Sequence, residues 1–197
     1  MKIQDINEID DLLFSYEDIA QKLGIENESA KVLCSRYVKL GYLLRIKRGV
    51  YMRRERWQYL SNNELLQIAN IIQVPSYISL TTALSYYDFT TQVQQNFVES
   101  IAVKRSLIKT VQKVDFRYFK IAQQYYNGFI KQNGIFIAAP EKALADALYL
   151  TSVGKYKLDF SALEYGKIDY PRLNQILRAY PEGTTKLWSN YARTQAA

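Results

Sequence analysis

Five basic side chains lie close together in residues 41–54, the segment GYLLRIKRGVYMRR, and they could neutralise phosphate groups. Arginine and lysine donate charged hydrogen bonds to phosphate oxygens, and each phosphate neutralised on duplex DNA releases counterions. Short apolar runs on both sides of Gly49 predict a β-hairpin whose turn, Lys47-Arg48-Gly49, places glycine at positive φ. The alternative is a solvated edge, since charged edge strands discourage pairing between sheets. The five residues are Arg45, Lys47, Arg48, Arg53 and Arg54.

Charge is sorted along the first part of the chain. Residues 1–28 contain two basic and eight acidic side chains, a net charge of −6, whereas residues 29–56 contain nine basic and one acidic, a net charge of +8. The whole chain carries +7. A solvated surface would not separate its charges in this way, so the basic block favours an anionic partner such as nucleic acid.

Two short helices are predicted directly before the hairpin. Ser15 is a suitable N-cap with Asp18 three residues later, and Gly24 ends this helix in the left-handed conformation. Asn27 can cap the next helix, and Gly41 stops it. Two helices joined by a three- to four-residue turn that opens with glycine are typical of a helix-turn-helix. An amphipathic helix predicted over residues 5–14 completes the layout of a winged helix, with the hairpin as its wing.

The second helix of this pair has two distinct faces. Its apolar side is expected to face the core and comprises Ala30, Leu33, Cys34, Tyr37 and Leu40. Its other side would present its N-terminal half to base edges, where Ser donates or accepts and Lys pairs with guanine, while the later basic residues lie near phosphates. The alternative is an ordinary solvated face. The DNA-binding residues predicted on this helix are Ser29, Lys31, Val32, Ser35, Arg36 and Lys39.

The rest of the chain predicts a larger α+β domain. A capping box at Ser61 and Glu64 opens an apolar helix that ends before Pro75, and a short strand and helix follow. Further strands are predicted around 97–104, 113–121 and 134–139, a helix from Pro140, and two more near 171–179 and 182–192. We therefore predict a winged helix-turn-helix domain over 1–57 and an α+β domain over 58–197, with a mixed or antiparallel sheet flanked by helices.

A second basic cluster spans two of these predicted strands and their connection. It could extend a DNA footprint, meet an acidic or RNA-bound partner, or be a solvated surface. The candidates for partner or nucleic-acid contact here are Lys104, Arg105, Lys109 and Lys113.

Several kinds of chemistry are disfavoured by composition. The chain has no histidine and one cysteine, which removes His-based nucleophile pairs, imidazole metal sites and a disulfide framework. No phosphate-binding glycine loop is present, and no apolar run approaches the roughly 18 residues of a membrane helix. The acidic N-terminus lacks the apolar region of a signal peptide. We expect a cytoplasmic protein with no cofactor, no metal, no membrane contact and no enzymatic activity.

Three segments, GYLLRIKRGVYM, YISLTTALSYYDF and IAAPEKALADALYL, resemble in order and spacing the AbiEi-type antitoxins of bacterial abortive-infection, type IV toxin–antitoxin systems. The resemblance spans roughly residues 8–155. It implies an N-terminal winged helix that represses its own operon, with DNA contacts at Arg45, Lys47, Arg48 and Arg53. It also implies a C-terminal antitoxin domain directed against a nucleotidyltransferase-like toxin, directly or through the toxin's target. Residues of the PEKALADAL helix, namely Pro140, Ala143, Leu144 and Leu148, would belong to the core of that domain.

Two other functions remain open from the sequence. A metal-dependent nuclease or nucleotidyltransferase would need clustered carboxylates, and Glu99 and Asp115 on neighbouring predicted strands are the best pair. The other alternative is a protein-interaction module whose winged helix no longer binds DNA. Our leading hypothesis is an autorepressor and antitoxin of a phage-defence system that binds its operator as duplex DNA, in an oligomeric state that the sequence does not indicate.

Overall fold

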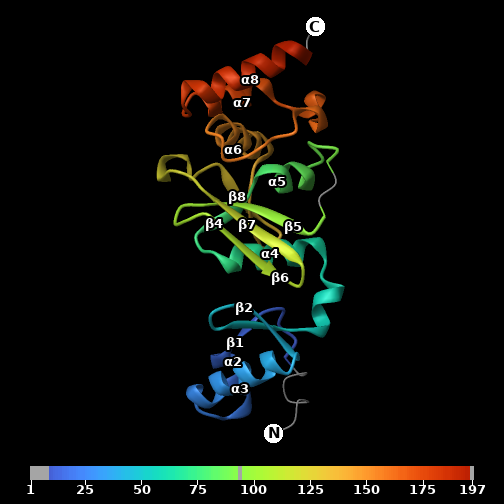
Figure 1. Ribbon diagram of the computed structural model, residues 1–197, viewed down its shortest axis with the longest axis vertical. Coiled ribbons are helices and arrows are strands. Elements are labelled where there is room, and N and C mark those ends of the chain that lie inside the picture. The colour runs from blue at the N-terminus through green and yellow to red at the C-terminus, as the bar shows by residue number, and fades with distance from the viewer. Residues whose placement is uncertain (1–8, 93–94, 196–197) are drawn as a thin grey trace. The chain divides into compact units, whose positions relative to one another are not determined.

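The computed structural model describes residues 9–92 and 95–195, and the chain divides into two compact units, residues 1–68 and 69–197 (Figure 1). The fold is mixed α+β and contains two separate sheets. The division into units falls inside a helix, α4 (Asn62–Ile72), so the domain assignment 1–57 and 58–197 stays a prediction.

The N-terminal unit combines two helices with a small antiparallel sheet whose strand order is β1-β3-β2. Its core contains buried side chains from all of these elements, including Phe14, Ile19, Ala30, Cys34 and Leu43. The elements, in order, are β1 (Phe14–Ser15), α2 (Tyr16–Leu23), α3 (Asn27–Lys39), β2 (Leu43–Lys47), β3 (Val50–Arg53) and the 3-10 helix η1 (Glu55–Tyr59).

The start and end of α2 follow local sequence signals. Ser15 Oγ accepts a hydrogen bond from the Asp18 N–H at 3.1 Å, and the Asp18 carboxylate accepts one from the Ser15 N–H at 2.7 Å. This confirms the predicted capping box, a motif whose loss typically costs about 1 kcal/mol. Gly24 ends the helix at φ 62°, as predicted.

Two expectations for α3 are wrong in detail. The N-cap is Glu26, which makes no capping bond with its side chain, and Asn27 is already the first helical residue. Leu40, expected in the core, is 56% exposed. Leu40 is the C-cap and keeps right-handed helical geometry, but at about 100° per residue it lies about 80° from the exposed Val32, so it falls at the margin of the solvent-facing side of the helix.

The helix predicted over residues 5–14 is also wrong over its described part, because residues 9–13 have no helical structure and Phe14 begins β1. Phe14 pairs with Tyr51 of β3 and is buried. A long-range strand pairing therefore overrides the helical spacing of the apolar residues. Residues 5–8 lie outside the described residues.

The second unit is built on a six-stranded mixed sheet in the order β6-β7-β5-β4-β9-β8. The pairs β5–β7 and β4–β9 are parallel, and the other neighbours are antiparallel, so the sheet is of the mixed type. The edge strands β6 and β8 were not predicted. The strands are β4 (Ser76–Ile78), β5 (Phe97–Ala102), β6 (Leu107–Val111), β7 (Val114–Lys120), β8 (Phe129–Gln132) and β9 (Ile135–Ala138).

Helices cover both faces of this sheet (Figure 1). On one face, the Tyr118 hydroxyl donates to the Ala69 carbonyl of α4 at 2.5 Å. On the other face lie α5 and α6, and Figure 1 shows α7 and α8 on the side of α6 remote from the sheet. The helices are α5 (Leu80–Tyr86), α6 (Pro140–Ser152), α7 (Tyr170–Leu177) and α8 (Glu182–Gln195), with 3-10 helices η2 (Gln123–Tyr125), η3 (Phe160–Ala162) and η4 (Tyr165–Lys167).

Two predictions for this part are confirmed by contacts and burial. Ser61 and Glu64 form the reciprocal capping box before α4, with the Ser61 N–H donating to the Glu64 carboxylate at 2.9 Å. Along α6, every residue from Glu141 to Leu148 is buried. Ala143, Leu144 and Leu148 are therefore core residues as expected, while Pro140 at the helix start is half-buried.

Candidate nucleic-acid interface

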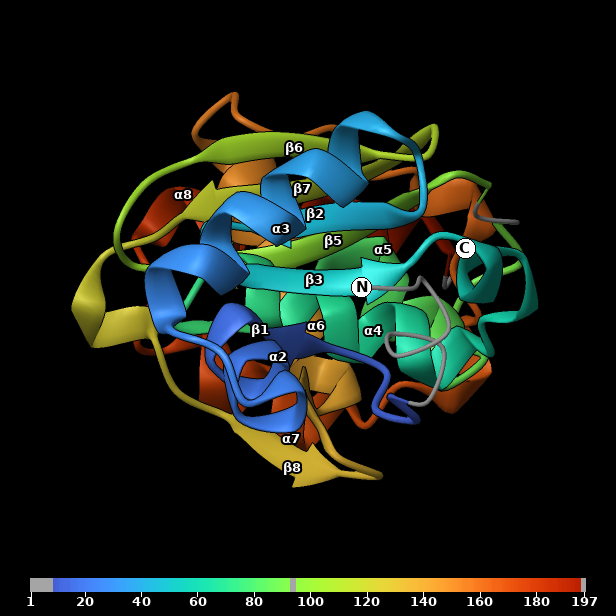
Figure 2. The same cartoon turned by 90° about the horizontal axis from the view of Figure 1, so that it is seen from below.

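The exposed face of α3 is polar apart from one residue at its middle. Figure 2 shows α3 crossing in front of β2 and β3, with one side of the helix turned away from the sheet. Ser29, Ser35, Arg36 and Lys39 are exposed on this side, and Val32 among them is 70% exposed. The structure thus brings five of the six predicted α3 residues to one solvent-facing stripe.

Lys31 is the sixth residue, and its charge is already engaged within the unit. Its Nζ lies 2.5 Å from Glu28 Oε1 and 4.7 Å from the centre of the Tyr16 ring. The hydrogen bond with Glu28 raises the pKa of Lys31. The ammonium group has further N–H donors that a base or phosphate could use, but the adjacent Glu28 carboxylate offsets part of its positive charge, so Lys31 is a weaker anion-binding group than the sequence suggested.

The basic hairpin has the predicted form. Strands β2 and β3 pair antiparallel, with an irregularity in register between Arg45 and Lys47, and Gly49 turns the chain at φ 77°. A Cβ atom at Gly49 would lie 3.5 Å from the Tyr16 ring, which also lies beneath Lys31. Tyr16 therefore lies against both the hairpin turn and Lys31 of α3, so the two candidate DNA-binding elements are close to each other.

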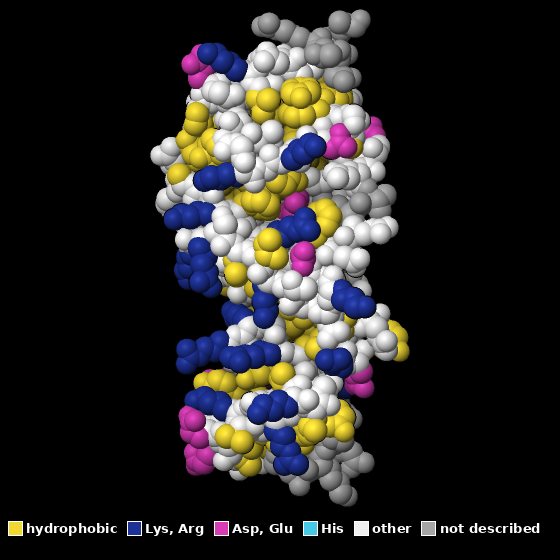
Figure 3. Space-filling view, in the orientation of Figure 1, with side chains coloured by type: hydrophobic (Ala, Val, Ile, Leu, Met, Phe, Trp, Pro, Cys, Tyr) yellow, Lys and Arg dark blue, Asp and Glu magenta, His cyan; other side chains and the backbone are white. Residues whose placement is uncertain are grey.

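The basic residues of the hairpin differ in availability. Arg45 and Arg48 are exposed, and Lys47 is half-buried. Arg53 Nη1 lies 3.3 Å from Glu55 Oε1 and is mostly covered, so it is held at the base of the hairpin, whereas Arg54 is exposed. Figure 3 shows Lys and Arg side chains gathered on the visible face of the N-terminal unit. We refer to Arg45, Lys47 and Arg48 as the hairpin basic cluster.

The second unit has its own basic surface. Lys104 and Arg105 lie in the connection between β5 and β6, Lys109 lies on the edge strand β6, and Lys113 lies at the β6–β7 turn with φ 68°. All four side chains are exposed. The segment between β5 and β7, which was expected to be a connection, thus contains the edge strand β6. These four basic residues therefore lie along the β6 edge of the sheet.

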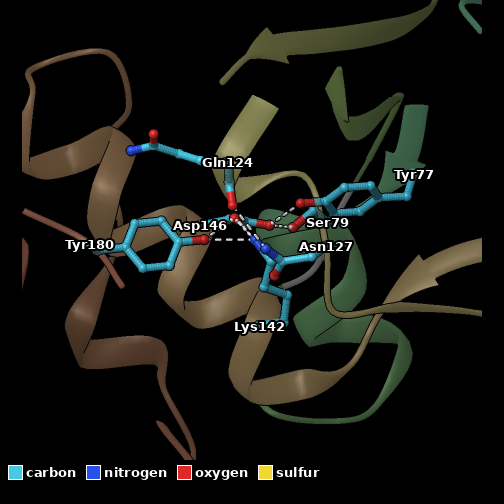
Figure 4. A network of polar contacts seen from close by, with 7 residues as sticks. All are labelled: Tyr77, Ser79, Gln124, Asn127, Lys142, Asp146 and Tyr180. Atoms are coloured by element: carbon cyan, nitrogen blue, oxygen red, sulfur yellow. Dashed lines mark hydrogen bonds and ion pairs between the residues drawn. The ribbon is translucent and has the colours of Figure 1, made fainter. Parts of the chain in front are cut away.

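A buried polar network lies at the centre of the second unit and was not foreseen from the sequence (Figure 4). The Asp146 carboxylate accepts hydrogen bonds from the hydroxyls of Tyr77 at 2.9 Å, Ser79 at 2.9 Å and Tyr180 at 2.8 Å. Lys142, one turn earlier on α6, donates to Asp146 and to the Tyr180 hydroxyl. The available signal was the four-residue spacing of a Lys and an Asp in an otherwise apolar helix.

The two carboxylates considered for metal chemistry face different partners. Glu99 is buried on β5 and accepts a hydrogen bond from the Tyr156 hydroxyl at 2.8 Å, and its burial raises its pKa to about 7. Asp115 on β7 accepts one from the Thr110 hydroxyl at 2.8 Å and lies 3.4 Å from Arg117. Within residues 9–92 and 95–195, no group of three or more His, Cys, Asp or Glu side chains could hold a metal ion.

Comparison with known families bears on the segment that contains α2, α3 and the hairpin. Residues 7–54 match the family model described as transcriptional regulator, AbiEi antitoxin. This segment is AbiEi-like. The resemblance drawn from the sequence is confirmed there, and the family concerned is one of regulators.

A comparison with solved structures identifies a similar fold, and a comparison with curated proteins finds no match. The crystal structure of the RV2827C protein from Mycobacterium tuberculosis superposes with a TM-score of 0.63 at 11% identity, over 95% of this chain and 73% of that one. This likeness shows a shared fold alone. No curated protein matches the chain. Across the described residues, no helix is both long and apolar enough to cross a membrane.

Proposed function

We propose that the protein is a transcriptional regulator that binds duplex DNA through a winged helix-turn-helix made of α2, α3 and the β2–β3 hairpin. The observation that carries this proposal is a coincidence of two features in one segment. The AbiEi match spans the same residues in which an exposed polar helix face lies beside a basic hairpin.

The dimensions and chemistry of α3 suit the major groove. Its 13 residues form a rod about 20 Å long, and the groove of B-DNA, about 12 Å wide, admits such a helix. Ser29 and Val32 would meet base edges, and Lys31 would join them through the N–H donors that Glu28 does not occupy. Ser35, Arg36 and Lys39 would follow along the groove, the two cations near phosphates.

The hairpin basic cluster would supply contacts that do not depend on sequence. Arg45, Lys47 and Arg48 can reach phosphates or the minor groove beside the helix, and Arg53 can add a contact near the hairpin base. Each neutralised phosphate releases counterions, so this part of the affinity falls steeply with salt. Phosphate contacts set the position of the protein on the duplex, while base contacts from α3 select which DNA sequence is bound.

We further propose that the operator is that of the protein's own operon, and that residues 69–197 carry an antitoxin activity against a nucleotidyltransferase-like toxin in the cytoplasm. The family description names a transcriptional regulator and an antitoxin, and its match covers residues 7–54, outside the unit to which we assign the antitoxin activity. Two compact units are consistent with two separable activities. The exposed basic side chains Lys104, Arg105, Lys109 and Lys113 are the proposed contacts for the toxin or its target.

A reporter fused to the DNA upstream of the gene tests the regulatory role. Wild-type protein should repress the reporter, and Arg48→Ala should relieve repression. Lys155→Ala, which removes an exposed charge from the second unit, is the matched control and should leave repression intact. Equal repression by all three proteins, or none by the wild type, would contradict the proposal.

The antitoxin role requires a separate test. The full chain is co-expressed with the product of the neighbouring gene, and growth is measured. A variant with Arg45, Lys47 and Arg48 all changed to Ala should still restore growth, because the antitoxin activity is assigned to the second unit. Growth arrest in the presence of soluble wild-type protein would eliminate this role and leave the regulator alone.

A further inference from the structure

Val32 is an apolar side chain at the centre of a face built for polar contacts. It is 70% exposed, so it contributes little to the core of its unit. At about 100° per residue, the exposed positions of α3 from Glu28 onward span an arc of roughly 120°, and Val32 lies within about 10° of its midpoint, whereas the exposed Asn27 in the first turn lies outside this arc. The other exposed positions on this arc are Glu28, Ser29, Ser35, Arg36 and Lys39.

The position and shape of Val32 limit what it can recognise. In the proposed DNA complex, the middle of the exposed arc is the part of α3 closest to the groove floor, where base edges lie. Valine offers no hydrogen bond, but its two methyl groups form an apolar surface. Because β-branching leaves one strongly preferred rotamer in a helix, these methyl groups are held in place before binding. The groove floor presents one apolar group for such a surface, the C5-methyl of thymine.

We propose that Val32 contacts the 5-methyl group of a thymine in the major groove, and that this contact makes thymine the preferred base at one position of each recognised site. The inference rests on the proposed DNA-binding function and names the base that the centre of α3 selects. The polar neighbours Ser29 and Arg36 contact the flanking bases or phosphates, and Val32 makes the contact with the thymine methyl group.

Replacement of thymine by deoxyuridine tests this contact because it removes that methyl group and keeps the base-pairing pattern. The full-length protein first selects short duplexes from a randomised pool. Each thymine of a selected duplex is then changed to deoxyuridine, one at a time, and affinities are measured by fluorescence anisotropy. The transfer free energy of one buried methyl group corresponds to about a fourfold loss of affinity. Wild-type protein should show this loss at one thymine of each site.

Val32→Ala completes a cycle of four measurements, with thymine or uracil and with valine or alanine. The variant should bind both duplexes equally, so the fourfold ratio should fall to about one. Ser35→Ala, on the same face, is the matched control: it should change the affinity for both duplexes by the same factor and therefore retain the thymine-to-uracil ratio. Because Val32 is exposed, Val32→Ala should unfold at the same temperature as the wild type, which thermal denaturation checks.

The outcomes separate this inference from the function on which it rests. Tight binding to the selected duplex, with the same thymine-to-uracil ratio in wild type and Val32→Ala at every position, would overturn the thymine contact and leave DNA binding standing. Failure of the wild-type protein to enrich any duplex over random DNA would overturn the proposed function and the thymine contact together.

Discussion

Substitution of Lys142 by methionine should destabilise the second unit strongly. The Lys142 side chain is 1% exposed, and its Nζ donates to Asp146, which is fully buried, and to the Tyr180 hydroxyl at 2.6 Å. Methionine keeps most of the aliphatic chain but removes the cation, so the Asp146 carboxylate is left in the core with neutral donors. Removing one partner of a buried ion pair typically costs about 3–5 kcal/mol.

The chain offers a matched control with the same spacing on a helix. Lys186 lies 2.8 Å from Glu182, four residues away, but these side chains are 69% and 79% exposed. Solvent screens such pairs, so Lys186→Met should change the free energy of unfolding by no more than about 0.5 kcal/mol. The difference between the two variants therefore isolates the effect of burial.

Urea-induced unfolding followed by tryptophan fluorescence measures both variants. Trp188 is buried in the second unit, and a Trp57→Phe background makes the signal specific to Trp188. The midpoint should shift for Lys142→Met with an unchanged dependence on urea, which indicates the same folded and unfolded states. If Lys142→Met costs no more than Lys186→Met, Lys142 and Asp146 do not form a buried charged pair in the folded protein.

Three further predictions concern separate parts of the molecule. Burial raises the pKa of Glu99 from its ordinary value of 4.5 to about 7. The contribution of Glu99 to stability is therefore fully present below pH 4.5 and is lost as the pH rises through 7. Glu99→Gln should flatten the pH dependence of urea unfolding across this window. Leu144→Ala, at a fully buried position, should lower the free energy of unfolding by about 2–5 kcal/mol in the same assay, and a cost below 1 kcal/mol would contradict its place in the core. Arg48→Ala should weaken binding to cognate and random duplexes alike, whereas Ser29→Ala should reduce the preference for cognate DNA by about 1–3 kcal/mol; titrations showing identical effects would refute the division between position and sequence readout.

The elements predicted correctly are those specified by a few neighbouring residues. Ser15 with Asp18 and Ser61 with Glu64 specify helix starts, and Gly24 and Gly49 specify the left-handed turns. In each case, the hydrogen bonds or φ values are satisfied within the motif, so distant contacts change little.

The elements that we did not predict depend on contacts between residues far apart in the sequence, which the spacing of residue types does not reveal. Phe14 pairs with Tyr51, which converts the end of a predicted helix into a strand. The edge strands β6 and β8 carry many exposed side chains, so they lack the apolar pattern of central strands. The Lys142–Asp146 network also joins residues from β4, α6 and the α7–α8 connection, and this convergence is a property of the fold.

The residues that form the candidate DNA-binding site were predicted from the sequence, but the contacts that some of them make were not. The exposed stripe of α3 and the basic hairpin follow from helical periodicity and charge. The pairing of Lys31 with Glu28 also follows from their three-residue spacing, although we did not predict it. The contact of Lys31 with Tyr16 does not, because it depends on how α2 packs beside α3.

The central claim is that the hairpin basic cluster binds DNA phosphates, and the salt dependence of duplex binding tests it most directly. Affinity of the full chain is measured over a range of salt concentrations. The same titrations use a variant with Arg45, Lys47 and Arg48 changed to Ala, and a control with Lys155, Lys157 and Lys186 changed to Ala. At about 0.9 counterions per phosphate contact, the cluster variant should make the slope of log affinity against log salt shallower by about 2.7. The control removes the same charge and should leave the slope unchanged. Equal changes of slope in the two variants, or no change in either, would contradict the claim.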